Sequence, residues 1–250
     1  MMPLRRTKIV VTVGPASWTE AVLGAFVREG VEAFRFNFSH ADYENFKRAV
    51  GALRNLESAS RPVTLIADLQ GPSVRLGDFE EFPVSAGDVV KFCAAGKAGD
   101  GVPVDEVVFN VVEENDVISV EAGRLAFRVL SNDGQVIKAQ ALVDGTLKPR
   151  KTLAVKGKDL PLPSLTPKDL KDLRFAIEAG FDAVALSFVR RAEDVLRARE
   201  ALEEAGSGDV KLIAKVETSS AVENIDAILD KSDGILVLSL IHISEPTRPY

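Results

Sequence analysis

Polar side chains interrupt one apolar stretch of the sequence at regular intervals. Arg35, Asn37 and Ser39 alternate with phenylalanines over residues 34–39. Side chains alternate faces along a strand, so we expect the phenylalanines to pack under helices and the polar groups to share the other face. A polar sheet edge would show the same alternation. Parallel strands, however, are usually apolar on both faces, so this row favours a ligand site at the carboxyl end of the strand.

A carboxylate ends a second apolar run, over residues 63–69. Asp68 lies where a lone carboxylate needs a cation or hydrogen-bond donors. Arg75 follows a Gly-Pro turn and is suited to bind a phosphate or a carboxylate. The alternative interpretation is a structural ion pair between Asp68 and Arg75.

A lysine and a glutamate end a third run, over residues 211–216. Lys215 and Glu217 are two positions apart and therefore point the same way from a strand. Glu217 could hold a hard cation, and Lys215 could neutralise charge that develops on a substrate oxygen. A buried salt bridge that only fixes strand register is the alternative.

Other reactive residue types carry weaker signals. Cys93 has no histidine near it in the sequence and is interpreted as a packing residue. His40 could contact a ligand at the mouth of its strand, or could equally cap a helix or lie on the surface. The sequence contains no Walker loop, no Cys/His metal cluster and no Ser-His-Asp signature.

Before residue 74 and after residue 157, apolar runs alternate with segments of helical periodicity. The block between these two regions has a different pattern. Within residues 74–157, short Val-rich stretches are separated by turn signals at 132–134 and 144–145, which predicts a small all-β domain. Ser17 and Thr166 are expected to cap helices, and Gly180 is expected to end one. A helix is also predicted around 222–229. The predicted strands outside the block are 8–13, 34–38, 63–69, 183–189, 211–216 and 234–238.

Strands linked by helices predict a parallel sheet, either a barrel or an open doubly wound sheet. No G-x-G-x-x-G follows the first strand, which weighs against a dinucleotide-binding fold. We therefore predict an α/β fold: a (β/α)8-type TIM barrel, incomplete with about six strands, and a small all-β domain inserted after strand three. The expected divisions are 1–73 and 158–237 for the barrel, 74–157 for the inserted domain and 238–250 for a separate tail.

Composition excludes several classes of protein. The 250 residues include 31 Lys plus Arg against 37 Asp plus Glu, a formal charge of −6, with 46% hydrophobic residues, which excludes disorder, collagen and coiled coil. The mild acidity argues against nucleic-acid and anionic-membrane partners. A single cysteine fits a reducing compartment, and no apolar run is long enough for a membrane span. We read no targeting signal and expect a cytoplasmic protein.

Four motifs occur together in the order and spacing of one family. Residues 7–17, 35–40, 68–72 and 213–217 resemble the corresponding motifs of pyruvate kinase, and the β block interrupts the chain where that family has its lid domain. The resemblance implies transfer of the phosphoryl group of phosphoenolpyruvate to ADP, giving pyruvate and ATP. It also implies Mg²⁺ and K⁺ as cofactors and a homo-oligomer, a tetramer in the family.

The resemblance also implies roles for individual residues. Lys215 matches the lysine that stabilises the enolate, and Glu217 matches a Mg²⁺ ligand. Arg35 matches an arginine that binds the substrate phosphate, and together with Lys215 it is expected to be catalytic. Arg75 matches a second phosphate contact. The matched K⁺ ligands are Asn37, Ser39, Asp68 and the carbonyl of Leu69, and the matched nucleotide contacts are Asn37, His40, Arg75 and Lys151.

The sequence departs from the family pattern at three places. Residues 151–157 differ from the family's lid hinge, and Ser73 stands where the family usually has a charged residue. After Val237 the family supplies a second Mg²⁺ carboxylate, whereas residues 238–250 match no part of the family and resemble a translated sequencing-adapter read-through. We expect this tail to be an artefact, the last two barrel strands to be missing, and the chain as written to be inactive.

Two other functions remain open at this stage. One is a non-catalytic pyruvate-kinase-like protein that binds a ligand or partner. The other is a different metal-dependent barrel enzyme acting on phosphoenolpyruvate or pyruvate, such as an aldolase, although the inserted β domain argues against it. The genomic sequence downstream of Val237 would discriminate between an enzyme and a binding protein.

Overall fold

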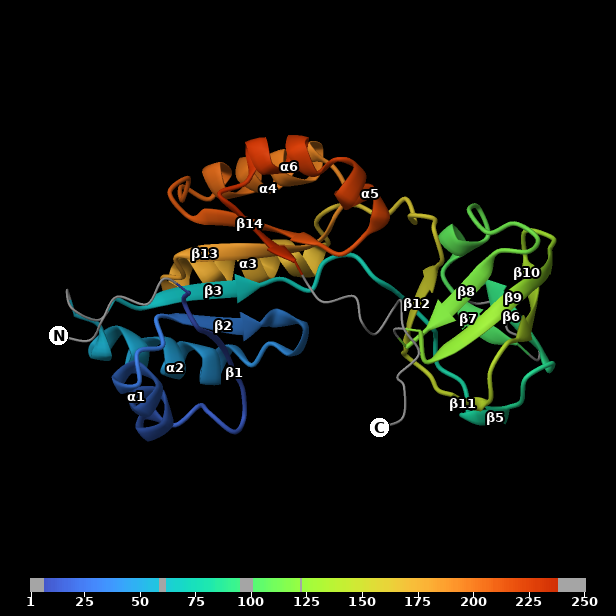
Figure 1. The fold of residues 1–250 in the computed structure, drawn as a ribbon, viewed down its shortest axis with the longest axis horizontal. Coiled ribbons are helices and arrows are strands. Elements are labelled where there is room, and N and C mark those ends of the chain that lie inside the picture. Colours follow the sequence, from blue (N-terminus) through green and yellow to red (C-terminus); the bar gives the residue numbers. More distant parts are fainter. Residues whose placement is uncertain (1–6, 59–61, 95–100, 122, 238–250) are drawn as a thin grey trace. The chain divides into compact units, whose positions relative to one another are not determined.

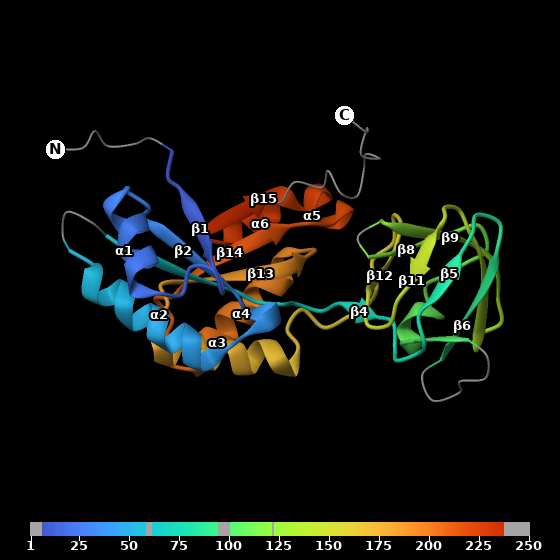
Figure 2. The same cartoon turned by 90° about the horizontal axis from the view of Figure 1, so that it is seen from below.

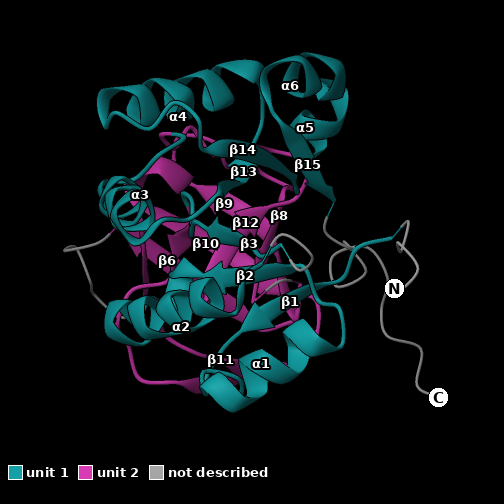
Figure 3. Cartoon of the chain, turned by 90° about the vertical axis from the view of Figure 1, so that its left-hand side faces the viewer, with its two compact units in different colours: residues 1–72, 164–238 teal, residues 73–163, 239–250 magenta. Residues whose placement is uncertain are grey.

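The computed structural model describes residues 7–58, 62–94, 101–121 and 123–237 (Figure 1). The expected tail, 238–250, lies outside the described residues. The chain forms two compact units, the first from the segments up to residue 72 and from residue 164, the second from residues 73–163 (Figure 3). Each unit is described by itself.

The first unit is built on a parallel six-stranded sheet. Neighbouring strands pair in parallel register in the order β1-β2-β3-β13-β14-β15, which confirms the predicted incomplete TIM barrel with six strands. The observed strands lie within one residue or two of the predicted ones. They are β1 (Val10–Val13), β2 (Ala33–Asn37), β3 (Thr64–Asp68), β13 (Ala183–Val189), β14 (Lys211–Val216) and β15 (Gly234–Val237).

Helices lie along the outer side of this curved sheet (Figure 3). They are α1 (Glu20–Arg28), α2 (Tyr43–Leu56), α3 (Pro167–Ala179), α4 (Ala192–Glu204), α5 (Ser219–Glu223) and α6 (Ile225–Lys231). As predicted, Phe34, Phe36 and Phe38 are fully buried in the core between sheet and helices. Phe36 packs edge-on against Phe46 and Phe181, an arrangement that adds to simple area burial.

Helix boundaries follow local capping chemistry. Thr166 caps α3 through a reciprocal capping box with Asp169, and Gly180 ends it with a φ of 80°. The prediction for Ser17 was wrong, because Thr19 caps α1 whereas Ser17 closes a turn with Gly14.

Two further boundary predictions were wrong. The helix predicted around 222–229 is two short helices that meet at Asn224, and its Val222 and Leu229 are 58% and 45% exposed. The second strand ends at Asn37, so Ser39 lies on a 3-10 turn, η1 (Phe38–His40), rather than on the strand face. Asn37 causes this change, since its side chain accepts the backbone N–H of Ser39 at 3.0 Å and turns the chain.

The second unit is a nearly closed β-barrel inserted after β3, as predicted (Figure 2). Its larger sheet has seven strands in the order β4-β12-β8-β9-β10-β6-β7, beside a β11-β5 pair. Its core is separate from that of the first unit, with Phe92 and Phe127 packed edge-on. The strands are β4 (Val74–Arg75), β5 (Phe82–Val84), β6 (Val89–Ala94), β7 (Val102–Val104), β8 (Val117–Val120), β9 (Leu125–Asn132), β10 (Val136–Ala141), β11 (Gly145–Leu147) and β12 (Thr152–Val155), with one 3-10 turn, η2 (Glu106–Val108).

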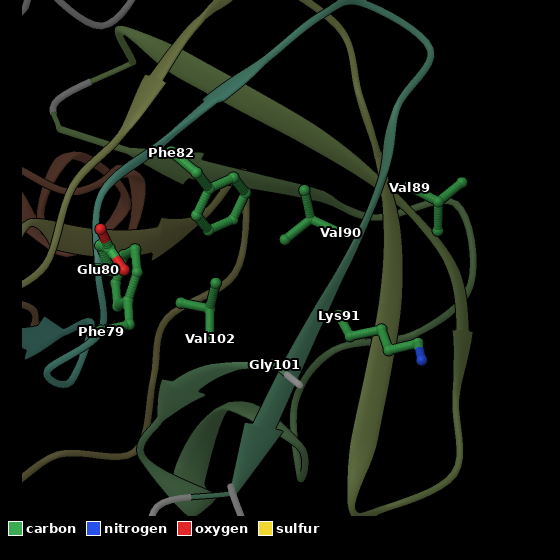
Figure 4. A pocket seen from close by; sticks show the side chains of 8 residues that line it. All are labelled: Phe79, Glu80, Phe82, Val89, Val90, Lys91, Gly101 and Val102. Atoms are coloured by element: carbon green, nitrogen blue, oxygen red, sulfur yellow. The ribbon is translucent and has the colours of Figure 1, made fainter. Parts of the chain in front are cut away.

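A pocket of about 550 Å³ lies in the second unit, beside β5, β6 and β7 (Figure 4). None of the residues predicted to act in the site lines it; the lining residues are Phe79, Glu80, Phe82, Val89, Val90, Lys91, Gly101 and Val102. Among the described helices, none has the length and apolar character needed to cross a membrane.

Candidate functional site

An arginine and an aspartate meet where β2 and β3 end. Asn37 and Asp68 are register partners at these strand ends. Arg35 donates from Nε to Asp68 Oδ2 at 2.7 Å, its Nη2 lies 2.5 Å from the same oxygen, and its Nη1 donates to Thr12 Oγ1 at 2.8 Å. Counting only the part of the chain that the structure describes, these three contacts leave two of the five guanidinium N–H groups for another acceptor. The Arg35 side chain is 25% exposed, so an anion can reach it.

A buried lysine joins this pair from β14. Lys215 Nζ donates to Ser187 Oγ at 2.7 Å and lies 3.1 Å from Asp68 Oδ1 and 3.4 Å from Glu217 Oε1. The Lys215 side chain is 8% exposed and that of Asp68 only 2%. The structure thus brings together two cations and two carboxylates from β2, β3 and the end of β14, a cluster we call the strand-end cluster (Arg35, Asp68, Lys215, Glu217).

The cluster contains ion pairs of the kind that the sequence raised as structural alternatives. Asp68 pairs with Arg35 and Lys215 of its own unit. The Lys215–Glu217 salt bridge is present, but it is part of a larger charged network and not an isolated pair. Buried charges of this kind are costly unless they are mutually paired, which explains why the four groups converge.

The turn after β2 is held by a second polar network. Lys168 donates to the carbonyl of Phe38 at 2.6 Å and to Asp172 at 2.5 Å, and Tyr43 donates to Asp172 at 2.5 Å. Burial and the hydrogen bond to Asp172 raise the pKa of Tyr43 to about 12. This network fixes η1, which carries Ser39 and the exposed His40.

The oxygens near Asp68 fit a large monovalent cation. Asp68 Oδ1 is buried and, within the described residues, accepts no hydrogen bond, because its contact with Lys215 lies outside hydrogen-bond geometry. The carbonyl of Leu69 accepts one hydrogen bond, from Ser187 at 2.6 Å, and a carbonyl oxygen has a second lone pair. Together with Asn37, which is in register with Asp68, these groups offer neutral oxygens and one carboxylate, and carbonyl oxygens can replace the hydration shell of K⁺.

Glu217 is the residue of the cluster that could hold a divalent cation. Its Oε2 accepts the backbone N–H of Phe188 at 2.9 Å, and its side chain is 13% exposed. Across the residues that the structure describes, no three His, Cys, Asp or Glu side chains gather as a metal cage. A single carboxylate nevertheless fits Mg²⁺, which commonly binds through one or two carboxylates plus the phosphates of its substrate.

Three residues singled out from the sequence belong to the second unit. Arg75 is exposed and donates to the carbonyl of Arg150 at 3.1 Å. Lys151 contacts Glu121 at 2.7 Å, and this hydrogen bond, opposed by partial burial, lowers the pKa of Glu121. Ser73 is half-buried, and its Oγ has no hydrogen-bond partner among the described residues.

Sequence reasoning missed Ser187 and Thr12. Ser187 carried a usable signal, because it is the one polar residue in the apolar run 183–189 and shares a strand face with Ala183 and Ala185. Thr12 carried no such signal, since a threonine is ordinary in a strand.

Comparisons with known proteins identify the family of this chain. The family model "Pyruvate kinase, barrel domain" matches residues 4–239. Pyruvate kinase from Agrobacterium vitis is 37% identical over 240 residues, which cover 93% of this chain and 50% of that protein. The Chlamydia pneumoniae enzyme is 33% identical, with coverage of 94% and 50%.

A solved structure extends the agreement to three dimensions. The crystal structure of pyruvate kinase from Pyrobaculum aerophilum superposes with a TM-score of 0.85 at 32% identity, covering 94% of this chain and 53% of that one. The chain therefore spans about half the length of the relatives it matches. The family match over nearly all of the sequence agrees with the half-barrel and its inserted β-barrel, and the chain belongs to the pyruvate kinase family.

Proposed function

We propose that this chain carries the phosphoenolpyruvate-binding and cation-binding residues of a pyruvate kinase, which transfers the phosphoryl group of phosphoenolpyruvate to ADP. The observation that supports this most is the strand-end cluster, which places a partly open guanidinium and a buried ammonium beside two carboxylates. Phosphoryl transfer depends on positioning and on cations around the migrating group more than on covalent chemistry.

Each residue of the cluster has a task in this proposal. The two remaining N–H groups of Arg35 bind the substrate phosphate, and Asp68 holds that guanidinium in place. Lys215 meets the negative charge that develops on the substrate oxygen as the enolate forms. Glu217 binds Mg²⁺, and bound Mg²⁺ supplies positive charge to the phosphoryl oxygens. Asn37, Ser39, Asp68 and the Leu69 carbonyl hold K⁺.

The second unit contributes residues that bind the nucleotide in this proposal. Arg75 and Lys151 bind phosphate oxygens of ADP, with His40 and Asn37 of the first unit as further nucleotide contacts. Lys151 is paired with Glu121 in the structure, so a polyphosphate would compete with that carboxylate for the ammonium.

Binding by the chain itself tests the substrate assignment. Isothermal titration calorimetry with phosphoenolpyruvate in Mg²⁺ and K⁺ buffer is expected to show saturable binding. Arg35→Met should weaken this binding at least tenfold, which corresponds to about 1.4 kcal/mol of binding free energy. Lys8→Met is the matched control, because Lys8 also forms an ion pair in the first unit but lies outside the cluster. Equal affinity of wild type and Arg35→Met would contradict the proposal.

Transfer itself is tested in a fusion protein. Residues 1–237 are joined to the C-terminal half of the Agrobacterium vitis relative, and pyruvate release is followed with phosphoenolpyruvate and ADP. We expect turnover, and we expect Lys215→Met to lower kcat by roughly 10²–10³ with little change in KM, because the lysine acts mainly in the transition state. A folded fusion that binds phosphoenolpyruvate without turnover would favour the non-catalytic binding protein instead.

A further inference from the structure

Strand β13 carries a bulge beside the strand-end cluster. Its pairing with β14 runs from Leu186↔Ala214 directly to Val189↔Val216, so β13 contains one residue more than β14 over this step. Ser187 and Phe188 form the bulge, and Phe188 has a φ of 57°. A left-handed conformation is a genuine outlier for a bulky residue, and such conformations persist only where the surroundings enforce them.

Two successive residues of the bulge contact two different members of the cluster. The Ser187 hydroxyl accepts from Lys215 Nζ at 2.7 Å and donates to the carbonyl of Leu69 at 2.6 Å. The Phe188 N–H donates to Glu217 Oε2 at 2.9 Å. In a regular strand the backbone N–H would be used in the sheet ladder, so the bulge frees it for a side chain.

A glycine on the loop after β3 makes room for the bulge. A Cβ on Gly71 would lie 2.7 Å from Ser187 Cβ, 2.9 Å from the Ser187 carbonyl oxygen and 3.2 Å from Phe188 Cδ2. Gly71 also has a φ of 69°, and its N–H donates to the buried Asp169 at 3.0 Å. Only glycine combines this close approach with this backbone conformation.

The contacts of Lys215 define what the bulge accomplishes. Its ammonium has three acceptors nearby, and the shortest contact is to the neutral Ser187, not to Asp68 or Glu217 at 3.1 and 3.4 Å. Without the hydroxyl, the ammonium would move onto the carboxylates and form closer ion pairs there. A lysine neutralised in that way would be less available to a developing enolate.

We propose that the Ser187–Phe188 bulge is the positioning element of the site, which holds the Lys215 ammonium and the Glu217 carboxylate in the orientation that substrate binding requires. This inference rests on the proposed function, which identifies the ligands that Lys215 and Glu217 bind. Ser187 acts through Lys215, and Gly71 acts by leaving space for Ser187.

The test uses the full 250-residue chain labelled with ¹⁵N-lysine. Hydrogen-bonded ammonium groups exchange protons slowly enough to be observed in a ¹⁵N–¹H spectrum, and Lys215→Met assigns the signal. We expect Ser187→Ala to shift or remove the Lys215 signal and Ser187→Thr to retain it. The Lys168 signal is an internal control, because Lys168 is hydrogen-bonded to Asp172 and Phe38 outside the cluster.

A binding measurement links the same variant to function. Oxalate is a planar dianion that mimics the enolate, whereas inorganic phosphate probes the phosphate subsite. We expect Ser187→Ala to weaken oxalate binding about tenfold in Mg²⁺ buffer, which is the effect of losing one hydrogen bond to a charged group. The affinity for phosphate should stay unchanged. Ser232→Ala is the matched control, since Ser232 also donates to a backbone carbonyl, at 2.8 Å, but has no hydrogen bond to an ammonium among the described residues.

The two measurements separate the possible failures. If wild type binds neither oxalate nor phosphoenolpyruvate, the proposed function is contradicted, and the Lys215 signal still decides the positioning role. An unchanged Lys215 signal in Ser187→Ala, or equal weakening by Ser187→Ala and Ser232→Ala, would overturn the inference. Gly71→Ala is expected to reproduce the loss of the Lys215 signal where it folds, and Ser187→Ala provides the test where it does not.

Discussion

Removing the charge of Asp68 should destabilise the first unit more than removing a charge on its surface does. Asp68 is 2% exposed and is the shared counter-ion of Arg35 and Lys215. Asp68→Asn keeps the shape of the side chain but leaves the Lys215 ammonium, which is 8% exposed, facing a neutral amide. Removing one partner of a buried ion pair costs about 3–5 kcal/mol, a large part of the roughly 5–15 kcal/mol that stabilises a typical domain.

Urea denaturation followed by tryptophan fluorescence measures this loss. The sequence has a single tryptophan, Trp18, which packs against the core of the first unit and therefore reports on that unit. Linear extrapolation gives the free energy of unfolding of each variant. Glu32→Gln is the control, because Glu32 also forms an ion pair, with Lys8, but the side chains are 33% and 49% exposed and the expected loss is below about 1 kcal/mol.

A second substitution tests whether the Lys215 ammonium is the cause of the loss. After Asp68→Asn, Lys215 keeps only its longer contact with Glu217, at 3.4 Å, and adding Lys215→Met removes this poorly paired buried charge. We expect the double variant to recover at least about 1 kcal/mol relative to Asp68→Asn alone, within the range of coupling between residues in contact. A loss below about 1 kcal/mol in Asp68→Asn, or strictly additive effects in the double variant, would refute this account of the cluster.

Three further predictions follow from single features. Gly180→Ala should lower the free energy of unfolding by about 1 kcal/mol in the same urea assay, because the residue has a φ of 80° and an added Cβ meets no atom within 4 Å, so backbone strain is the only cost. Burial opposes ionisation of Asp233, but the Leu212 N–H and the Arg199 guanidinium outweigh it and lower its pKa. The stabilisation by Asp233 is therefore present above the unfolded pKa of about 4 and is lost as pH falls through the folded value, so the stability difference from Asp233→Asn should shrink in urea curves recorded below pH 4. K⁺ should raise the phosphoenolpyruvate affinity of the chain over tetramethylammonium at equal ionic strength, and equal affinity in calorimetry would show that the oxygens around Asp68 do not hold K⁺.

Strands and the inserted domain could be predicted because their signals are local. The run 211–216 was predicted at its observed bounds, since it is a short apolar segment rich in strand-forming residues. The all-β block was recognisable from its turn residues, and Gly134 indeed adopts a φ of 83° between β9 and β10. The charged residues of the site were found for a similar reason, because charge at the end of a buried strand is unusual in any fold.

The errors arose where two local structures compete. Ser17 and Thr19 can both cap a helix, and only the turn with Gly14 decides that Ser17 is already used. Asn37 continues the alternation of β2 by sequence, yet its side chain binds the N–H of Ser39 and ends the strand. Val222 and Leu229 have helical spacing, but the break at Asn224 separates them onto two helices.

The bulge at Ser187 and Phe188 could not be predicted from one strand alone. Residues 183–189 are seven in a row that suit a regular buried strand. The extra residue exists only relative to β14, and register between strands is a property of pairing, not of either sequence segment. The contact between Ser187 and Lys215 is therefore the part of the site that required the structure.

The balance of charges in the strand-end cluster leads to one last prediction, that an anion and a cation bind to it cooperatively. Two cations face two carboxylates, so an anion arriving alone at Arg35 and Lys215 competes with Asp68 and Glu217, and a divalent cation arriving alone at Glu217 competes with Lys215. When both arrive, each relieves the repulsion that the other meets. Thermodynamic linkage requires the same factor in both directions, typically 5–150-fold for coupled sites. Titrating Mn²⁺ as a paramagnetic probe with and without phosphoenolpyruvate, and phosphoenolpyruvate with and without Mn²⁺, should give equal factors above about fivefold, whereas independent binding would show that Glu217 and Arg35 do not serve one site.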